Sequence, residues 1–163
     1  MVVLNVGCGP TRIVGEIGVD LHPTGGCDVQ ADLMALPFAD GSVDAVRLDH
    51  VLEHLDQRLG VAALLEARRV LKQGGDIRVG VPDLSAYFAA WLDGPADHAT
   101  RAALLRGIYG GQTHEGEYHR SGYDAATLKD LLEAVGFAVT GVRDDDGPFR
   151  TEGFCIAATG VKA

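Results

Sequence analysis

Short runs of apolar residues alternate along the chain with segments whose apolar residues recur at helical spacing. Four apolar runs with β-branched residues predict strands at residues 2–6, 17–21, 42–48 and 77–81, and a weaker run at 28–32 predicts one more. Two later runs, at 137–142 and 154–159, flank a polar turn at 144–147. We expect these two to form a hairpin.

Helical periodicity lies mainly between the later strands. One set of apolar residues stops at Gly74, which we expect to end its helix: Val61, Leu64, Leu65 and Leu71. A second set follows Asp83 as N-cap: Leu84, Phe88, Trp91 and Leu92. A third fits the spacing i, i+3, i+4, i+7 between an N-cap at Asp124 and a terminating Gly136: Leu128, Leu131, Leu132 and Val135.

Strands that alternate with helices predict an α/β fold, a doubly wound and mostly parallel sheet with helices on both faces. The 163 residues are enough for one domain with its own core. Such sheets bind ligands beyond the carboxyl ends of their strands, where the strand order reverses. Functional residues are therefore expected just after strands.

Charge and composition narrow the choice of partners. A formal net charge of −9 argues against nucleic acid, which is bound through Lys and Arg. The three cysteines form no Cys-x-x-Cys pair, which favours reduced thiols in the cytoplasm. The chain has no signal-peptide pattern and no run of about 18 apolar residues, so we expect neither export nor membrane insertion. A small-molecule ligand remains.

Three features suited to a nucleoside follow the first three strands. Gly7-Cys8-Gly9 lets the backbone approach a ligand closely, Asp20 suits a ribose diol, and Asp32 suits an exocyclic amine beside apolar Leu33. Alone, the glycine pair is equally well explained by a tight turn, and a single Asp at a strand end is more often a cap, but the order and spacing of the three features favour a shared pocket.

A dinucleotide site is the nearest alternative. Its fingerprint needs a third glycine, where this chain has Arg12, and an acid about 20 residues further on. Asp20 follows Gly9 by only 11 residues, too few for a full helix that would face a diphosphate. A nucleoside without phosphates fits this spacing better.

Several segments in this order resemble the successive motifs of class I S-adenosylmethionine-dependent methyltransferases, in particular a compact type-11-like subgroup. They are LNVGCGP, VDLHP, ADLMALPFADGSVDAVRLDHVLEHL and RRVLKQGG, within residues 2–82, and less sharply HRSGYDAATLKDLLEAVGF at 119–137. The resemblance implies a Rossmann-like sheet of seven strands in the order 3-2-1-4-5-7-6, with the last strand antiparallel. The chain departs from the family in its shortened first crossover, at residues 11–16.

The resemblance also implies roles in binding S-adenosyl-L-methionine. Gly7 and Gly9 would lie against its methionine part, Asp20 at the ribose and Asp32 at the adenine amine. Asp49, with His50 behind it, would lie near the amino group. The expected cofactor residues are Gly7, Cys8, Gly9, Asp20, Leu21, Asp32, Leu33, Asp49 and His50.

The segment His50-Val51-Leu52-Glu53-His54 also matches the H-x-x-E-H pattern of a zinc peptidase. Such an enzyme would need a further carboxylate ligand, and the same letters belong to the methyltransferase motif. We therefore expect no metal, and expect Glu53 and His54 to satisfy each other or cap a helix. The acidic run at 144–146 is read as a solvated turn.

Residues 83–124 are expected to form the acceptor pocket, as an insertion in the single domain 1–163. Their polar part, at 110–124, contains His114 and His119, which with His50 are the candidate catalytic residues because histidine is the natural base near neutral pH. Five apolar residues form either an aromatic wall there, with Tyr87 and Trp91 as its candidates, or, as their spacing favours, the buried core face of a helix: Leu84, Tyr87, Phe88, Trp91 and Leu92.

We expect an enzyme that methylates an oxygen or nitrogen atom of a small-molecule acceptor. A module of the same fold that binds the nucleoside without catalysis is the alternative. Because the chain shows no segment before its first strand to close the cleft, a homodimer that covers it is also expected.

Overall fold

A computed structural model describes residues 1–22, 25–94, 97–144 and 154–163. Within them a seven-stranded sheet has the order β3-β2-β1-β4-β5-β7-β6, as expected. Strands β1 to β5 are parallel, and β7 is antiparallel to both β5 and β6. The strands are β1 (Val3–Val6), β2 (Ile17–Asp20), β3 (Val29–Gln30), β4 (Val43–Asp49), β5 (Leu71–Pro82), β6 (Phe137–Asp144) and β7 (Cys155–Lys162).

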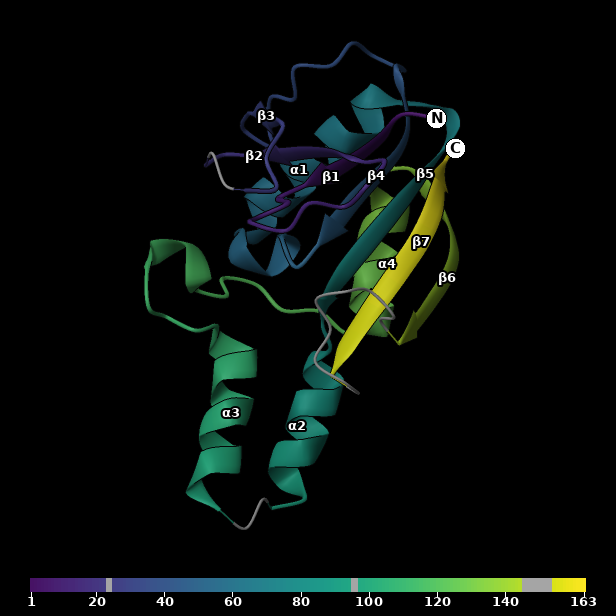
Figure 1. Ribbon diagram of the computed structural model, residues 1–163. Helices are drawn as coiled ribbons and strands as arrows, with labels where there is room; N and C mark the ends of the chain where they lie inside the picture. Colours follow the sequence, from purple (N-terminus) through teal and green to yellow (C-terminus); the bar gives the residue numbers. More distant parts are fainter. Residues whose placement is uncertain (23–24, 95–96, 145–153) are drawn as a thin grey trace.

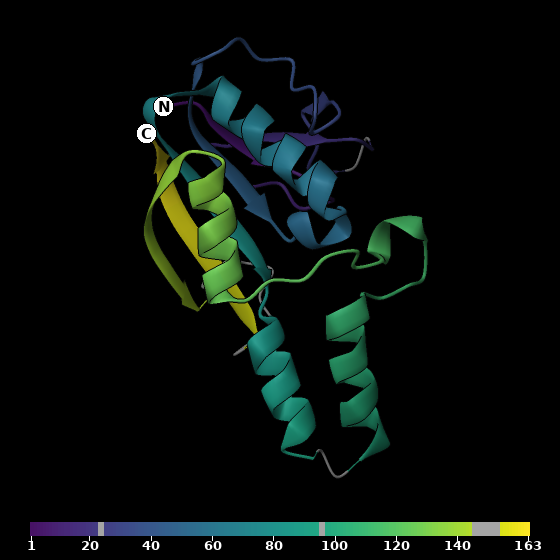
Figure 2. The same cartoon turned by 180° about the vertical axis from the view of Figure 1, so that it is seen from behind.

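Two of the helices cover one face of this sheet, α1 (Gln57–Val70) and α4 (Ala125–Ala134). They bury Leu64, Leu128 and Leu132 against the strands. The other two helices, α2 (Leu84–Leu92) and α3 (His98–Tyr109), extend from the sheet as a hairpin (Figures 1 and 2). Short 3-10 turns, η1 (Leu52–His54) and η2 (Glu115–Glu117), complete the described elements.

The first helix ends earlier than its apolar spacing predicts. It stops at Val70, and Leu71 is already paired with Val43 in β5. Gly74 lies within that strand at φ +71, where the register between β4 and β5 shifts. Glycine therefore permits a bulge here rather than terminating a helix, and the predicted helix end at Gly74 is wrong.

The helical hairpin also differs from expectation. Asp83 caps α2 as predicted, accepting a hydrogen bond from the Ser85 amide at 3.0 Å. Of the large apolar residues of α2 only Tyr87 is buried, whereas Phe88 is 50 % and Leu92 82 % exposed, so the core-face interpretation is wrong for these two. Helix α3 was not expected, because it buries only Leu104 and has a weak apolar stripe.

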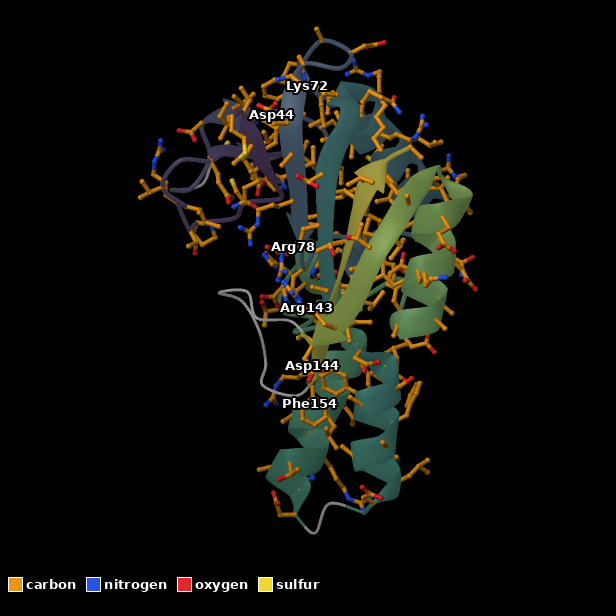
Figure 3. The ribbon with its side chains drawn as sticks, turned by 90° about the vertical axis from the view of Figure 1, so that its right-hand side faces the viewer. Asp44, Lys72, Arg78, Arg143, Asp144 and Phe154 are labelled. Atoms are coloured by element: carbon orange, nitrogen blue, oxygen red, sulfur yellow. The ribbon has the colours of Figure 1, made fainter. Side chains whose placement is uncertain are left out.

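The link from β1 to β2, residues 7–16, contains no helix, so the crossover predicted to be shortened is a loop. The Gly7 amide donates to the Val19 carbonyl at 2.8 Å, so the turn that follows β1 begins beside β2. Without a crossover helix, part of the other sheet face is covered by charged side chains. Arg47 bridges Glu16 and Asp49 there, and Arg78, which is labelled in Figure 3, also contacts Asp49.

Candidate functional site

The turn after β1 is built for close approach. Gly7 and Gly9 have φ values of +72 and +55, in the left-handed region that favours glycine. A Cβ atom at Gly7 would lie 2.4 Å from Val51 Cγ2, so a side chain there would collide with the wall of the neighbouring cavity. Cys8 between them is buried, and burial with nearby Asp20 raises its pKa to about 11. It is a neutral thiol at pH 7.

Asp20 stands at the end of β2, beside this turn. Its Oδ2 accepts from the Gly9 amide at 2.9 Å and its Oδ1 from the His22 amide at 3.0 Å. Each carboxylate oxygen has two acceptor positions, so one on each remains for a ligand hydroxyl. Asp20 therefore fixes the glycine turn and can also accept from a ribose diol.

Asp32 follows β3 and faces the same cavity. Its Oδ1 accepts from the Met34 amide at 2.9 Å, which leaves acceptor capacity for an amine. The cavity has a volume of about 170 Å³ and is lined by Val6, Gly7, Val19, Asp20, Leu21, Ala31, Asp32, Leu33, Met34, Val51 and Leu55. Carboxylates at two strand ends with apolar walls between them fit the adenosine half of S-adenosylmethionine, which has a flat ring and a diol.

Asp49, expected near the amino group of the cofactor, is held by two arginines of the chain. Its side chain is 2 % exposed and lies 3.2 Å from Arg47 Nη2 and 3.2 Å from Arg78 Nε. The carboxylate is thus neutralised by two guanidinium groups of the chain itself. The ammonium group of a bound cofactor would have to share the Asp49 carboxylate with both arginines.

His50, the next residue, has a φ of +57, an uncommon value for a side chain of this size. Its Nδ1 lies 3.0 Å from Glu53 Oε1. Burial lowers the His50 pKa, but hydrogen bonds with Cys155 and Glu53 outweigh it and raise the pKa to about 10. His50 therefore carries a proton at neutral pH and does not act as a free base.

His119 is brought to η1 by backbone hydrogen bonds between segments distant in the sequence. The Arg120 and Ser121 amides both donate to the Glu53 carbonyl, at 2.7 and 3.1 Å. The His119 ring packs edge-on against His54, with centroids 4.9 Å apart. Burial is the main cause that lowers the His119 pKa, so this imidazole is neutral at pH 7.

His114 is not part of this cluster. Its side chain is 70 % exposed, and its Nδ1 lies 3.9 Å from Glu117 Oε2. Among the three candidate histidines, only His119 combines a neutral ring with a position next to η1. Val51 and Leu55, which flank η1 in the chain, line the nucleoside cavity, so His119 stands near the cofactor side of the molecule.

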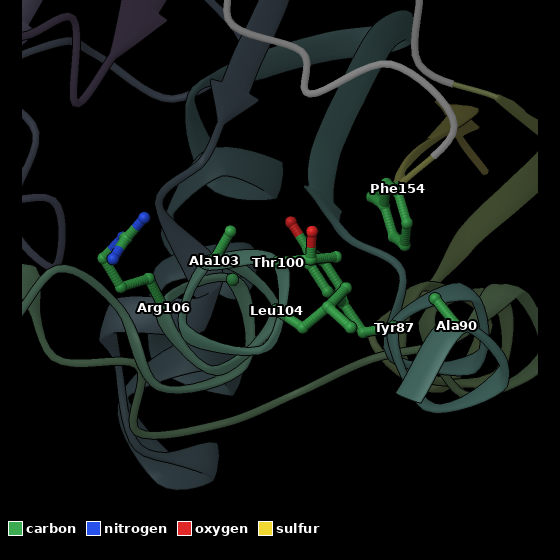
Figure 4. Close-up of a pocket in the computed structure, with 8 residues that line it drawn as sticks. Tyr87, Ala90, Thr100, Ala103, Leu104, Arg106 and Phe154 are labelled. Carbon is green, nitrogen blue, oxygen red and sulfur yellow. The ribbon is translucent and has the colours of Figure 1, made fainter. Parts of the chain in front are cut away.

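A second and larger cavity, open to solvent and of about 530 Å³, lies between the two helices of the hairpin (Figure 4). Tyr87 of α2 faces Thr100 and Leu104 of α3, and Phe154 closes it with its ring 4.7 Å from that of Tyr87. A Cβ atom at Gly107 would lie 2.0 Å from the Tyr87 ring, so glycine is needed for the two helices to meet there. Of these residues, the sequence pointed only to Tyr87.

Comparison with known proteins agrees with this geometry. Residues 4–79 match the family described as "Methyltransferase domain". A methyltransferase from Archaeoglobus fulgidus described as SAM-dependent has the same fold, with a TM-score of 0.66 at 19 % identity over 98 % of this chain and 85 % of its own. The chain thus has the fold of class I S-adenosylmethionine-dependent methyltransferases, and the part of it that forms the strand-end pocket matches a methyltransferase-domain family.

Two further relatives add detail. A Burkholderia thailandensis 1,6-didemethyltoxoflavin-N1-methyltransferase, crystallised with its substrate and S-adenosylhomocysteine, has a TM-score of 0.69 at 18 % identity, over 99 % of this chain and 71 % of its own. An uncharacterised 37.1 kDa protein from a Streptomyces fradiae transposon is 30 % identical over 67 % of this chain. The match spans only 39 % of that relative's length. None of the helices described here is long and apolar enough to cross a membrane.

Proposed function

We propose that this chain transfers the methyl group of S-adenosylmethionine to an oxygen or nitrogen atom of a small-molecule acceptor. The observation that carries the proposal is the cavity at the ends of β1, β2 and β3, where Gly7, Asp20 and Asp32 meet. The bound cofactor supplies a methyl group already activated on a sulfonium sulfur. The protein's main task is then to hold the acceptor in line with it.

The residues of the chain divide this task. Asp20 and Asp32 hold the adenosine part by accepting its hydroxyl and amine hydrogens, and the Gly7–Gly9 turn gives the methionine part room. An acceptor hydroxyl must give up a proton when it is methylated. We assign that proton, or the placement of the acceptor, to His119, because its ring is neutral and lies beside η1. His114 and His50 are weaker candidates for the reasons of exposure and charge given above.

We place the acceptor against residues 83–124, whose two helices form the 530 Å³ cavity. This volume falls within the usual range for small-molecule sites, and its walls are mainly apolar. One structural neighbour, a 1,6-didemethyltoxoflavin-N1-methyltransferase, has the small molecule 1,6-didemethyltoxoflavin bound. An apolar, ring-containing acceptor would suit the Tyr87 and Phe154 walls here. The net charge of −9 disfavours nucleic acid, and we expect a cytoplasmic protein.

Calorimetric titration with S-adenosylhomocysteine tests the pocket. We expect Asp20→Ala to weaken binding by at least about tenfold, because two hydrogen bonds to a charged acceptor are lost. Asp130→Ala, an exposed carboxylate on α4, is the matched control and should bind like the parent chain. Equal affinity in all three proteins would remove Asp20 from the site.

Catalysis is tested separately, by S-adenosylhomocysteine release against a panel of small hydroxylated and nitrogen-containing aromatic compounds. Turnover supports the enzyme. Tight cofactor binding without turnover across the panel would favour the alternative, a non-catalytic binding module. A homodimer that covers the cleft is tested by sedimentation with and without the cofactor.

A further inference from the structure

Three side chains with metal-binding atoms meet beside η1. Glu53 and His54 lie on η1 itself, and His119 arrives from the segment after η2. One ligand atom from each lies within 4.8 Å of the other two. Ligands about 2.0–2.2 Å from a zinc-type ion are roughly 3.5 Å apart, so small side-chain rotations would close the set on one ion.

The Glu53 carboxylate is incompletely satisfied. Its side chain is 2 % exposed, and Oε1 is held by His50 Nδ1 at 3.0 Å. Its Oε2 is buried and has no hydrogen-bond partner among the described residues. An unpaired carboxylate oxygen in the interior is costly, and such atoms call for an explanation. A cation next to the two imidazoles would supply the missing partner.

The surroundings also orient the ligands as metal sites do. His54 Nδ1 lies 3.3 Å from the Tyr118 carbonyl, so an Nδ1–H donated there leaves Nε2 as the free ligand atom. His50 fixes the Glu53 carboxylate from behind in the same way. Glu53 and His54 thus each have a hydrogen-bond partner in the protein that orients the side chain. The ligands of metal sites are usually oriented by such outer-shell hydrogen bonds.

We propose that Glu53, His54 and His119 bind one divalent transition-metal ion of the zinc type. Two imidazoles and one carboxylate suit such an ion better than magnesium or calcium, which prefer oxygen ligands alone. Three protein ligands leave a coordination position for water or an acceptor oxygen.

The inference rests on the proposed function and refines it. The ion, with His119 as one of its ligands, would hold and acidify an acceptor hydroxyl, in place of His119 accepting the proton itself. The inference replaces the expectation of a metal-free chain. It also differs from the H-x-x-E-H pattern, since His119 takes the place of His50 as a ligand.

The test is metal binding to the full chain after chelator treatment and dialysis. Co²⁺ serves as a coloured stand-in, followed by visible absorption, and Zn²⁺ is measured by its displacement of Co²⁺. We expect one ion per chain. His54→Ala and His119→Ala should each weaken Co²⁺ binding by at least about 100-fold, whereas His98→Ala, an exposed imidazole at the start of α3, should not. Thermal melting shows whether each variant is folded, and two independent histidine variants protect the test if Glu53→Gln does not fold.

Absence of saturable Co²⁺ binding up to about 1 mM, or binding unchanged in both histidine variants, would overturn the metal site. In that case the role of the buried Glu53 carboxylate is its pair with His50. Titration with S-adenosylhomocysteine keeps the two proposals apart. Cofactor binding without Co²⁺ binding refutes the ion alone, and Co²⁺ binding without cofactor binding refutes the methyltransferase function alone.

Discussion

Gly7 shows how a single residue couples the backbone to the cofactor cavity. Replacing it with alanine imposes both the cost of a positive φ and a clash with Val51. We expect Gly7→Ala to lower the free energy of unfolding by about 1–3 kcal/mol and to weaken S-adenosylhomocysteine binding at least tenfold. Chemical denaturation and calorimetry measure the two effects.

Gly41 provides the matched control at the same scale. It has a φ of +62, but the nearest atom to an added Cβ is the Leu71 carbonyl oxygen at 4.0 Å. Gly41→Ala should therefore cost stability through backbone strain while leaving cofactor affinity unchanged. If both variants lost affinity equally, the collision with Val51 would not be the cause. The glycine turn was predictable from the sequence, but the neighbour that makes Gly7 irreplaceable was not, because Val51 belongs to a distant segment.

At the scale of elements, α1 holds the segment that carries the adenine side of the pocket. Glu66 accepts from the Leu36 amide at 2.8 Å and from Arg69 at 2.7 Å. Arg69 in turn donates to the Phe38 carbonyl at 2.9 Å and to the Leu36 carbonyl at 3.0 Å. The chain after Asp32 and Leu33 is thereby fastened to a rigid helix.

This fastening predicts a pH dependence. The hydrogen bond from Arg69, followed by that from Leu36, lowers the Glu66 pKa below its usual value. A lowered folded-state pKa stabilises the protein above the unfolded-state pKa, and the gain is lost as the pH falls through the folded-state pKa. We expect Glu66→Gln to lower the free energy of unfolding at pH 7 by about 1–2 kcal/mol. The difference from the parent chain should shrink as the pH falls below about 4, close to the usual glutamate pKa.

Glu133→Gln is the control, because its pair with Lys129 is exposed on α4 and such pairs contribute little. Unfolding curves between pH 3 and pH 7 measure the difference in free energy of unfolding between Glu66→Gln and the parent chain. A difference that stayed constant over this range would contradict the role of the Glu66 charge.

Elements with a strong periodic signal could be predicted, and those held by tertiary contacts could not. The β-branched runs and the capped helix α4 lie where the sequence places them, and Asp124 with Thr127 forms a capping box there. Helix α3 was not predictable because Leu104 is the one residue it buries, which leaves a weak apolar pattern in the sequence. Likewise Asp20 and Asp32 follow from strand order alone. The meeting of His119 with Glu53 depends on backbone hydrogen bonds between distant segments, which no spacing rule encodes.

At the scale of the whole molecule, the helices α1 and α4 lie on the same side of the sheet. The other side carries the ionic chain Glu16–Arg47–Asp49–Arg78 in place of a crossover helix. Asp49 is its centre and is also the residue expected near the cofactor's amino group. The two roles predict different outcomes for one substitution.

Asp49→Asn removes the negative charge between two guanidinium groups while keeping the size of the side chain. If the role of Asp49 is structural, the melting temperature falls, because breaking a buried ion pair costs about 3–5 kcal/mol. The affinity for S-adenosylhomocysteine, measured below the melting temperature, then stays within about twofold. A contact to the cofactor ammonium would instead weaken binding tenfold or more. We expect the structural outcome, because both carboxylate oxygens already face arginines at 3.2 Å. Arg47→Met with intact Asp49 supplies the comparison, since it should lower stability through the same network and leave cofactor affinity unchanged. A large affinity loss confined to Asp49→Asn would restore Asp49 to the methionine end of the pocket.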